Sequence, residues 1–208
     1  MKNKLIILIL MLFSYGWATN VVAQELEDGT RPEYRRPNFK VYTSLEQALA
    51  YPDSVYILSL KGKKLTDWPP EISSFKNLLV LDLSKNKLSE IPSGIEKWVN
   101  LIELDLSNNK LKQLPQEISG MKSLRKLSLN RNTISELPES IGDMTSLEIL
   151  ELWDNEISEL PSSIRNLKHL KILEMRGILF SEEQQQEFRE LLPETRVMMS
   201  PSCNCKTR

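Results

Sequence analysis

The chain has 208 residues and a net charge of −1, with 27 basic residues against 28 acidic residues. This balance argues against a nucleic-acid partner, which would require a basic face. The seven glycines form no glycine-rich phosphate loop or nucleophile elbow, and HExxH is absent from the sequence, which argues against the enzyme classes that carry those motifs.

The first 23 residues have the layout of a secretory signal peptide. Lys2 and Lys4 precede an apolar run over residues 5–13, and a weaker segment ends at Ala23. We expect cleavage after Ala23, export to the periplasm, the cell surface or the medium, and no membrane span in the mature chain. An uncleaved anchor is the alternative, because the segment is nearly long enough to cross a bilayer. Cleavage would leave 25 basic and 28 acidic residues, a net charge of about −3.

Residues 24–40 are predicted to form a flexible polar arm, because prolines, a glycine and charged residues interrupt any apolar period. Arg31, Arg35 and Arg36 cluster in this arm. We interpret them as part of a solvated linker, with contact to an anionic surface as the alternative.

Residues 41–54 are predicted to form an N-terminal cap. Thr43 or Ser44 can begin a short amphipathic helix, and Pro52 would end it. Such a helix would cover the open apolar edge of the segment that follows.

A pattern of 23 residues, LxxLxLxxNxLxxLPxxIxxLxx, repeats over residues 55–180. Its six units begin at Val55, Leu78, Leu101, Leu124, Leu147 and Leu170. The alternation within LxLxx predicts a short strand with one buried side. The proline biases the residue before it toward extended geometry. One unit buries too little apolar surface to offset its chain entropy, so neighbouring units must stack.

An asparagine at the ninth position of four units falls where the strand must turn. Its amide can hydrogen-bond backbone groups that the turn would leave unpaired. We therefore predict a structural ladder formed by Asn86, Asn109, Asn132 and Asn155. Lys63 and Ile178 replace the asparagine in the first and last units, as terminal coils would allow.

Residues 181–200 are predicted to form a C-terminal cap, in which Ser181 and Gln184 give the capping-box pattern of a helix and residues 195–199 a last strand. The tail over residues 201–208 holds the two cysteines, Cys203 and Cys205. We favour an oxidised or idle pair. A disulfide between two chains and a metal site shared by a dimer remain alternatives.

The repeat resembles the leucine-rich repeat family, in its 23-residue class and its exported bacterial type, over residues 55–192. The resemblance implies an α/β fold: a right-handed solenoid with a parallel concave sheet, six repeats and helical caps at both ends. It implies a protein or peptide ligand on the concave face, and no particular partner. An envelope scaffold, tethered by the N-terminal arm or disulfide-linked through the tail, is the alternative function.

Catalysis finds little support in the sequence. The single histidine, His169, is interpreted as a solvated loop residue rather than a general base. A solenoid offers an open surface instead of an enclosed pocket that would perturb paired carboxylates. We therefore expect no enzyme activity, cofactor or metal site.

The outward positions of the strands form the surface that could bind a ligand. Trp153 stands at the seventh position of its unit, where the three preceding units carry small polar residues. Tryptophan and arginine are enriched at binding hot spots. The predicted ligand-binding patch consists of Asn130, Arg131, Glu151, Trp153, Asp154 and Arg176. The alternative is an exposed surface tryptophan stacked on Arg131 or Arg176 without a binding role.

Overall fold

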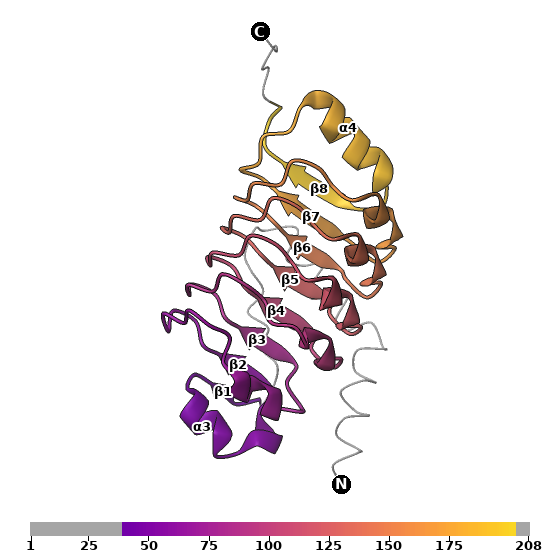
Figure 1. Cartoon of the computed structure of the whole chain (residues 1–208). Coiled ribbons are helices and arrows are strands. Elements are labelled where there is room, and N and C mark those ends of the chain that lie inside the picture. Colours follow the sequence, from indigo (N-terminus) through magenta and orange to yellow (C-terminus); the bar gives the residue numbers. More distant parts are fainter. Residues whose placement is uncertain (1–38, 203–208) are drawn as a thin grey trace. The chain divides into compact units, whose positions relative to one another are not determined.

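Eight short parallel strands form one sheet in the computed structural model, which describes residues 39–202 (Figure 1). The strands are β1 (Val41–Tyr42), β2 (Ile57–Ser59), β3 (Val80–Asp82), β4 (Glu103–Asp105), β5 (Lys126–Ser128), β6 (Ile149–Glu151), β7 (Ile172–Met175) and β8 (Arg196–Met199). Each strand pairs with the next one along the chain, as in a solenoid. The chain separates into Met1–Phe39 and Lys40–Arg208, and all these elements belong to the second unit.

The strand register follows the sequence repeat. Leu58 pairs with Leu81, and Leu81 pairs with Leu104, one repeat further on. Leu104 and Leu106 are buried while Asp105 between them faces the other side of the sheet and is half-buried. The predicted α/β solenoid with a parallel sheet is confirmed, and the leucine positions form one continuous core along it.

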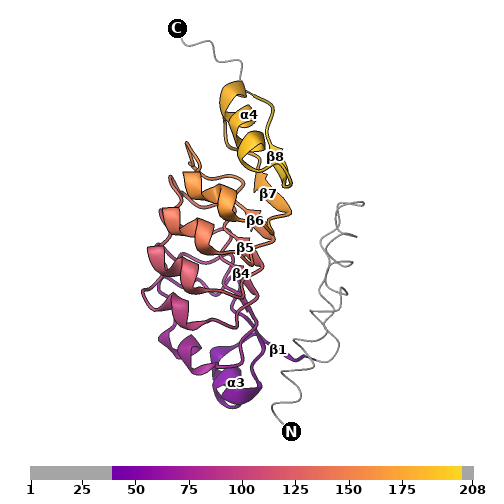
Figure 2. The ribbon, with the colours of Figure 1, turned by 90° about the vertical axis from the view of Figure 1, so that its right-hand side faces the viewer.

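The side of each coil opposite the strands is built from short 3-10 helices. They are η1 (Pro52–Ser54), η2 (Pro70–Ser74), η3 (Ile95–Lys97), η4 (Gln116–Gly120), η5 (Glu139–Asp143) and η6 (Ser162–Asn166). Pro115 is the N-cap of η4, and the helix buries Ile118 against the core. Figure 2 shows η helices stacked along the convex side, away from the strands. The Leu-Pro step therefore ends the extended segment and opens a helical turn.

The asparagines of the ninth position join neighbouring coils. Asn132 Nδ2 donates to the carbonyl oxygen of Leu129 in its own coil at 2.8 Å and to that of Leu106 in the preceding coil at 3.1 Å. Asn132 Oδ1 accepts from the Leu111 N–H at 3.0 Å. Asn86, Asn109 and Asn155 make the same three kinds of bond in their coils.

The eighth position of every unit adopts a left-handed backbone conformation. Arg131 and Asp154 have φ of 55° and 59°, and Gly177 has a φ of 78°. A non-glycine residue pays a conformational cost in this region. The backbone conformation of this turn thus sets the direction in which a side chain at the eighth repeat position leaves the sheet.

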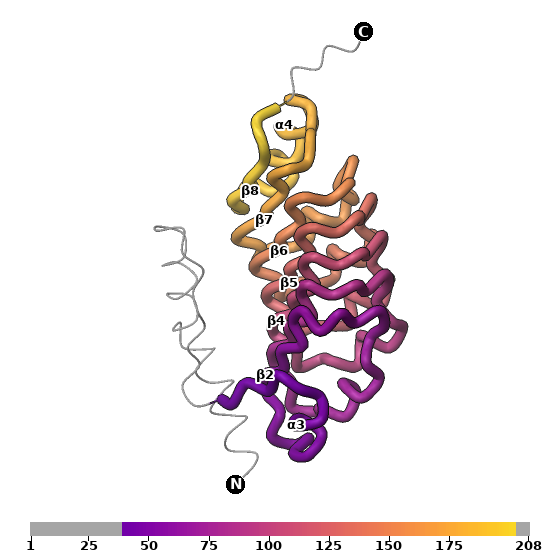
Figure 3. Tube along the Cα trace, turned by 90° about the vertical axis from the view of Figure 1, so that its left-hand side faces the viewer, coloured from indigo at the N-terminus to yellow at the C-terminus, as the bar shows by residue number. Residues whose placement is uncertain are grey.

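Two caps close the stack, and Figure 3 traces the coils between them. At the N-terminal end, helix α3 (Leu45–Leu49) buries Ala48, and Ser44 is its N-cap, without a side-chain capping bond. Strand β1, which the sequence analysis did not predict, extends the sheet beyond the first repeat. The six repeat strands are therefore flanked by one strand on each side.

At the C-terminal end, helix α4 (Glu182–Leu191) begins with the capping box predicted for Ser181 and Gln184, and both of its bonds are present. Phe180 and Phe188 pack edge to face with ring centroids 4.9 Å apart. Strand β8 pairs with β7, so the predicted last strand is confirmed. No helix among residues 39–202 is long and apolar enough to cross a membrane. The predicted signal peptide and the cysteines Cys203 and Cys205 lie outside the described residues.

Candidate ligand-binding surface

The residues of the predicted patch come from three adjacent coils near the C-terminal end of the sheet. The register pairs Ser128 of β5 with Glu151 of β6, and Glu151 with Glu174 of β7. The seventh and eighth positions follow directly after these strands. The fold therefore gathers the patch over β5, β6 and β7, three neighbouring strands in Figure 1.

Trp153, at an outward position of the sheet, is half-buried. The guanidinium carbon of Arg131, from the preceding coil, lies 4.6 Å from the centroid of the Trp153 ring. Arg131 Nε lies 3.7 Å from Asp154 Oδ2, and these two side chains are 56% and 62% exposed. One ring face is thus covered by a cation, and such stacking contributes about 0.5–1 kcal/mol at an exposed site.

Asn130 has a different environment from the rest of the patch, because it is only 2% exposed. Its Oδ1 accepts from the Trp153 backbone N–H at 3.0 Å, and its Nδ2 donates to Glu151 Oε2 at 3.2 Å. Both ends of the amide are therefore engaged inside the protein. Asn130 is thus bonded to both Trp153 and Glu151 and is almost fully buried.

Glu151 is also held by its neighbours. Ser128 Oγ donates to Glu151 Oε2 at 2.6 Å, and Lys126 Nζ lies 3.3 Å from Glu151 Oε1. Lys126 and Ser128 were not among the residues predicted from the sequence to form the patch. Both stand on β5, where Ser128 pairs in register with Glu151 and Lys126 pairs with Ile149.

Arg176 forms a bidentate pair that the sequence analysis also missed. Its Nε and Nη2 donate to the two carboxylate oxygens of Glu174 at 2.7 and 2.8 Å. The Glu174 residue is only 6% exposed, whereas most of the Arg176 side chain is exposed. Glu174 raises the pKa of Arg176 through these hydrogen bonds and its charge. The spacing i, i+2 at the end of β7 could have indicated the pair, since alternate residues of an extended segment face the same side.

Three family models match consecutive parts of the chain: Leucine Rich Repeat over residues 77–98, Leucine Rich repeats (2 copies) over residues 99–140, and Leucine-rich repeat region over residues 121–182. The chain belongs to the leucine-rich repeat family. Proteins of this family commonly use the concave face of the solenoid as an extended binding surface for other proteins. No curated protein matches the chain.

Solved leucine-rich repeat structures resemble the fold. The plant peptide hormone receptor RGFR1, in complex with RGF2, is 27% identical with a TM-score of 0.60, over 76% of this chain and 26% of the receptor. The ectodomain of GASSHO1/SCHENGEN3 from Arabidopsis thaliana, in complex with CASPARIAN STRIP INTEGRITY FACTOR 2, is 33% identical with a TM-score of 0.58, over 70% of this chain and 18% of that one. An internalin from Listeria monocytogenes is 19% identical with a TM-score of 0.57, over 76% of this chain and 53% of the internalin. The chain thus spans about half or less of the length of these proteins.

Acidic side chains occupy the fifth repeat position in several neighbouring strands of this leucine-rich repeat sheet. Asp82 pairs in register with Asp105, and the same column contains Glu151 of the patch and Glu174. Burial is the main cause that raises the pKa of Asp105, and the charges of Asp82 and Glu151 raise it further, against opposing hydrogen bonds from Ser107. The fifth-position column of the concave face is therefore acidic in four of the six repeat units.

The raised pKa of Asp105 has a consequence for the pH dependence of stability. The native state binds a proton more tightly at this carboxyl than the unfolded chain does, so the group destabilises the fold as the pH rises above the ordinary aspartate range. We expect Asp105→Asn to raise the thermal midpoint at pH 7, and the gain to disappear as the pH falls below about 4. Thermal unfolding from pH 3 to pH 8 tests this, with Asp143→Asn on the convex side as control. An Asp105→Asn midpoint at or below that of the unchanged protein at pH 7 would contradict it.

His169 is exposed, and its Nδ1 lies 2.8 Å from the carbonyl oxygen of Thr145. Among residues 39–202, the histidine, cysteine, aspartate and glutamate side chains form no group of three that could hold a metal ion. His169 lies in the segment between η6 and β7 and is not one of the patch residues.

Proposed function

We propose that the protein is an exported, non-enzymatic interaction module that binds a protein or peptide ligand on the concave face of its sheet, at the patch over β5 to β7. The observation that carries this proposal is the Arg131–Trp153 stack on an open parallel sheet, in which the guanidinium carbon lies 4.6 Å from the ring centroid. A rigid aromatic anchor beside arginines is the composition of a binding hot spot. The patch contains no nucleophile paired with a base, which supports a binding role.

The contacts divide the six patch residues into two groups. Trp153, Arg131, Asp154 and Arg176 keep exposed or half-exposed surface, and we assign them to ligand contact. Asn130 and Glu151 are engaged by their neighbours, and we assign them to positioning. Preorganised side chains bind at lower entropic cost, because little rotamer freedom remains to be lost.

The comparisons support a peptide or protein partner in general terms. RGFR1 and GASSHO1/SCHENGEN3 are leucine-rich repeat receptors whose structures hold RGF2 and CASPARIAN STRIP INTEGRITY FACTOR 2. Export is supported by the signal-peptide pattern over the first 23 residues. The acidic column next to the patch favours a ligand with basic residues beside its apolar anchor.

Photo-crosslinking in the cells that produce the protein tests this function. A photoreactive residue at Asp154, which is 62% exposed at the rim of the patch, is expected to capture a distinct protein adduct. The same residue at Lys112, an exposed position after the strand in a coil outside the patch, is the control. Equal adducts at both positions, or none at Asp154, would overturn the proposal.

A further inference from the structure

The coil over residues 78–100 departs from its neighbours on the convex side. Gly94 has a φ of 91°, which is outside the helical range. The same repeat position lies inside a five-residue η helix in the coils that contain η2, η4, η5 and η6. Helix η3 is therefore shorter and spans only Ile95–Lys97. Helices η3, η4, η5 and η6 pack successively on one another, whereas η2 and η3 do not pack closely. The stack therefore opens between these two coils.

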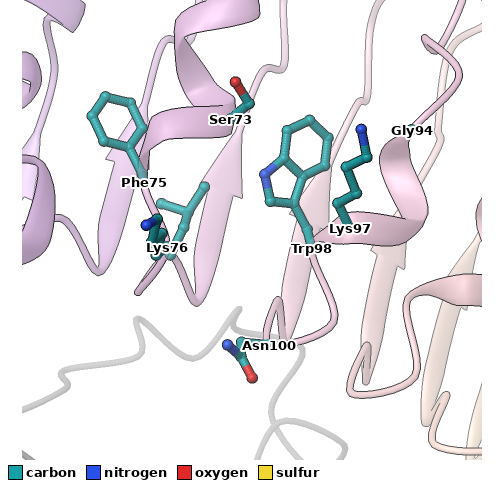
Figure 4. A pocket seen from close by; sticks show the side chains of 8 residues that line it. Ser73, Phe75, Lys76, Gly94, Lys97, Trp98 and Asn100 are labelled. Carbon is teal, nitrogen blue, oxygen red and sulfur yellow. The ribbon is translucent and has the colours of Figure 1, made fainter.

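A pocket of about 180 Å³ occupies this opening (Figure 4). It is lined by Ser73, Phe75, Lys76, Leu78, Gly94, Lys97, Trp98 and Asn100. Phe75 and Leu78 are almost fully buried and supply an apolar floor. The Lys97 side chain extends alongside the Trp98 ring in Figure 4. Pockets for drug-sized ligands run from about 300 to 1,000 Å³, so this one suits a group the size of a single side chain.

Two tryptophans replace smaller residues of the repeat at this place. Trp98 stacks on Trp68 with ring centroids 5.3 Å apart and an angle of 22° between the ring planes. The Trp68 Nε1 is buried and has no hydrogen-bond partner among the described residues. The contact between these two coils is thus aromatic, and within the described part of the chain it leaves one buried indole N–H without a hydrogen-bond partner.

The rim of the pocket is cationic. Lys76 and Lys97 come from the two flanking coils, are exposed, and form no ion pair within residues 39–202. Glu96, which precedes Lys97 in the sequence, lies with its Cβ against Gly120 of the next coil, where a Cβ on Gly120 would overlap it. None of the residues between 39 and 202 that line the pocket is acidic.

We propose that this pocket binds a carboxylate that carries one apolar group. The apolar group would lie against Trp98 over the Phe75 and Leu78 floor, and the carboxylate would meet the ammonium groups of Lys76 and Lys97. Either the carboxyl-terminal residue of a peptide with an apolar last side chain or a small free acid has this chemistry. The site is separate from the concave patch and does not depend on the function proposed for it.

Titration with N-acetylphenylalanine, monitored through the indole N–H resonances of the full chain, tests the site. We expect the Trp98 resonance, identified by Trp98→Phe, to shift saturably, and the neutral N-acetylphenylalaninamide to bind at least about fivefold more weakly because it lacks the charge. Stronger binding of N-acetylphenylalanine than of 3-phenylpropionate assigns the pocket to a chain terminus, and the reverse order assigns it to a free acid.

Charge-removing variants complete the test. The double variant Lys76→Gln/Lys97→Gln should bind N-acetylphenylalanine at least about tenfold more weakly, with an unchanged thermal midpoint because both lysines are exposed. Lys122→Gln/Lys168→Gln is the matched control, since both residues occupy the repeat position of Lys76 in other coils. Equal binding of the acid and the amide, wild-type affinity in the double variant, or no saturable shift would overturn the proposal.

Discussion

Replacing Asn132 with alanine is expected to lower the free energy of unfolding by about 3 kcal/mol. The buried amide donates to the carbonyl oxygens of Leu106 and Leu129, and it accepts from the Leu111 N–H. Alanine would leave the Leu111 N–H and the two carbonyl oxygens without this partner in a site too enclosed for bulk water. Each unsatisfied buried group costs about 1–3 kcal/mol, and the two coils that the amide joins would both lose support.

Urea unfolding, followed by far-ultraviolet circular dichroism, measures this loss. Asn166→Ala is the control, because Asn166 is exposed on η6 and its expected effect is below about 0.5 kcal/mol. Asn132→Asp keeps the acceptor for Leu111 but places a carboxylate beside two carbonyl oxygens, so it should destabilise the fold at least as much as alanine. An Asn132→Ala variant as stable as the control would show that the ladder does not stabilise the stack.

The repeat made most of the fold predictable from the sequence. Because the period is constant, aligning Leu81 with Leu104 by sequence also aligns them in space, and the parallel register follows. Strand β1 could not be predicted in this way, since Val41 and Tyr42 lie outside the repeat and two residues are too few to display alternation. Their extended conformation depends on pairing with Ile57 and Leu58.

For the candidate patch, the sequence predicts only which repeat positions lie next to one another on the sheet. The register dictates that Trp153 and Arg176 follow neighbouring strands, so their proximity could be inferred from spacing. Which side chains pair depends on rotamers and on neighbours from the next coil. The Glu174–Arg176 pair and the burial of Asn130 are outcomes of that kind. The opening beside Gly94 likewise depends on a single backbone angle that the repeat pattern does not specify.

Substitution of Trp153, the aromatic residue of the patch, tests whether this side chain binds the ligand or only stabilises the fold. With the photoreactive residue kept at Asp154, Trp153→Ala is expected to reduce the adduct yield at limiting protein concentration at least tenfold, equivalent to about 1.4 kcal/mol of binding free energy. Trp153→Phe keeps a ring for Arg131 to stack on and should give an intermediate yield. Ser107→Ala, at the same repeat position two coils earlier, should leave the yield unchanged.

The thermal midpoint decides how a loss of adduct is interpreted. Trp153→Ala removes the Arg131 stack, worth about 0.5–1 kcal/mol, while the core leucines beneath it stay buried. A loss of this size lowers the midpoint of a domain of 150–250 residues by only about 2–4 °C. A lost adduct with a nearly unchanged midpoint therefore assigns Trp153 to the ligand. An intact adduct together with a much larger fall in the midpoint would make the tryptophan structural and would move the search for the binding site away from the concave patch.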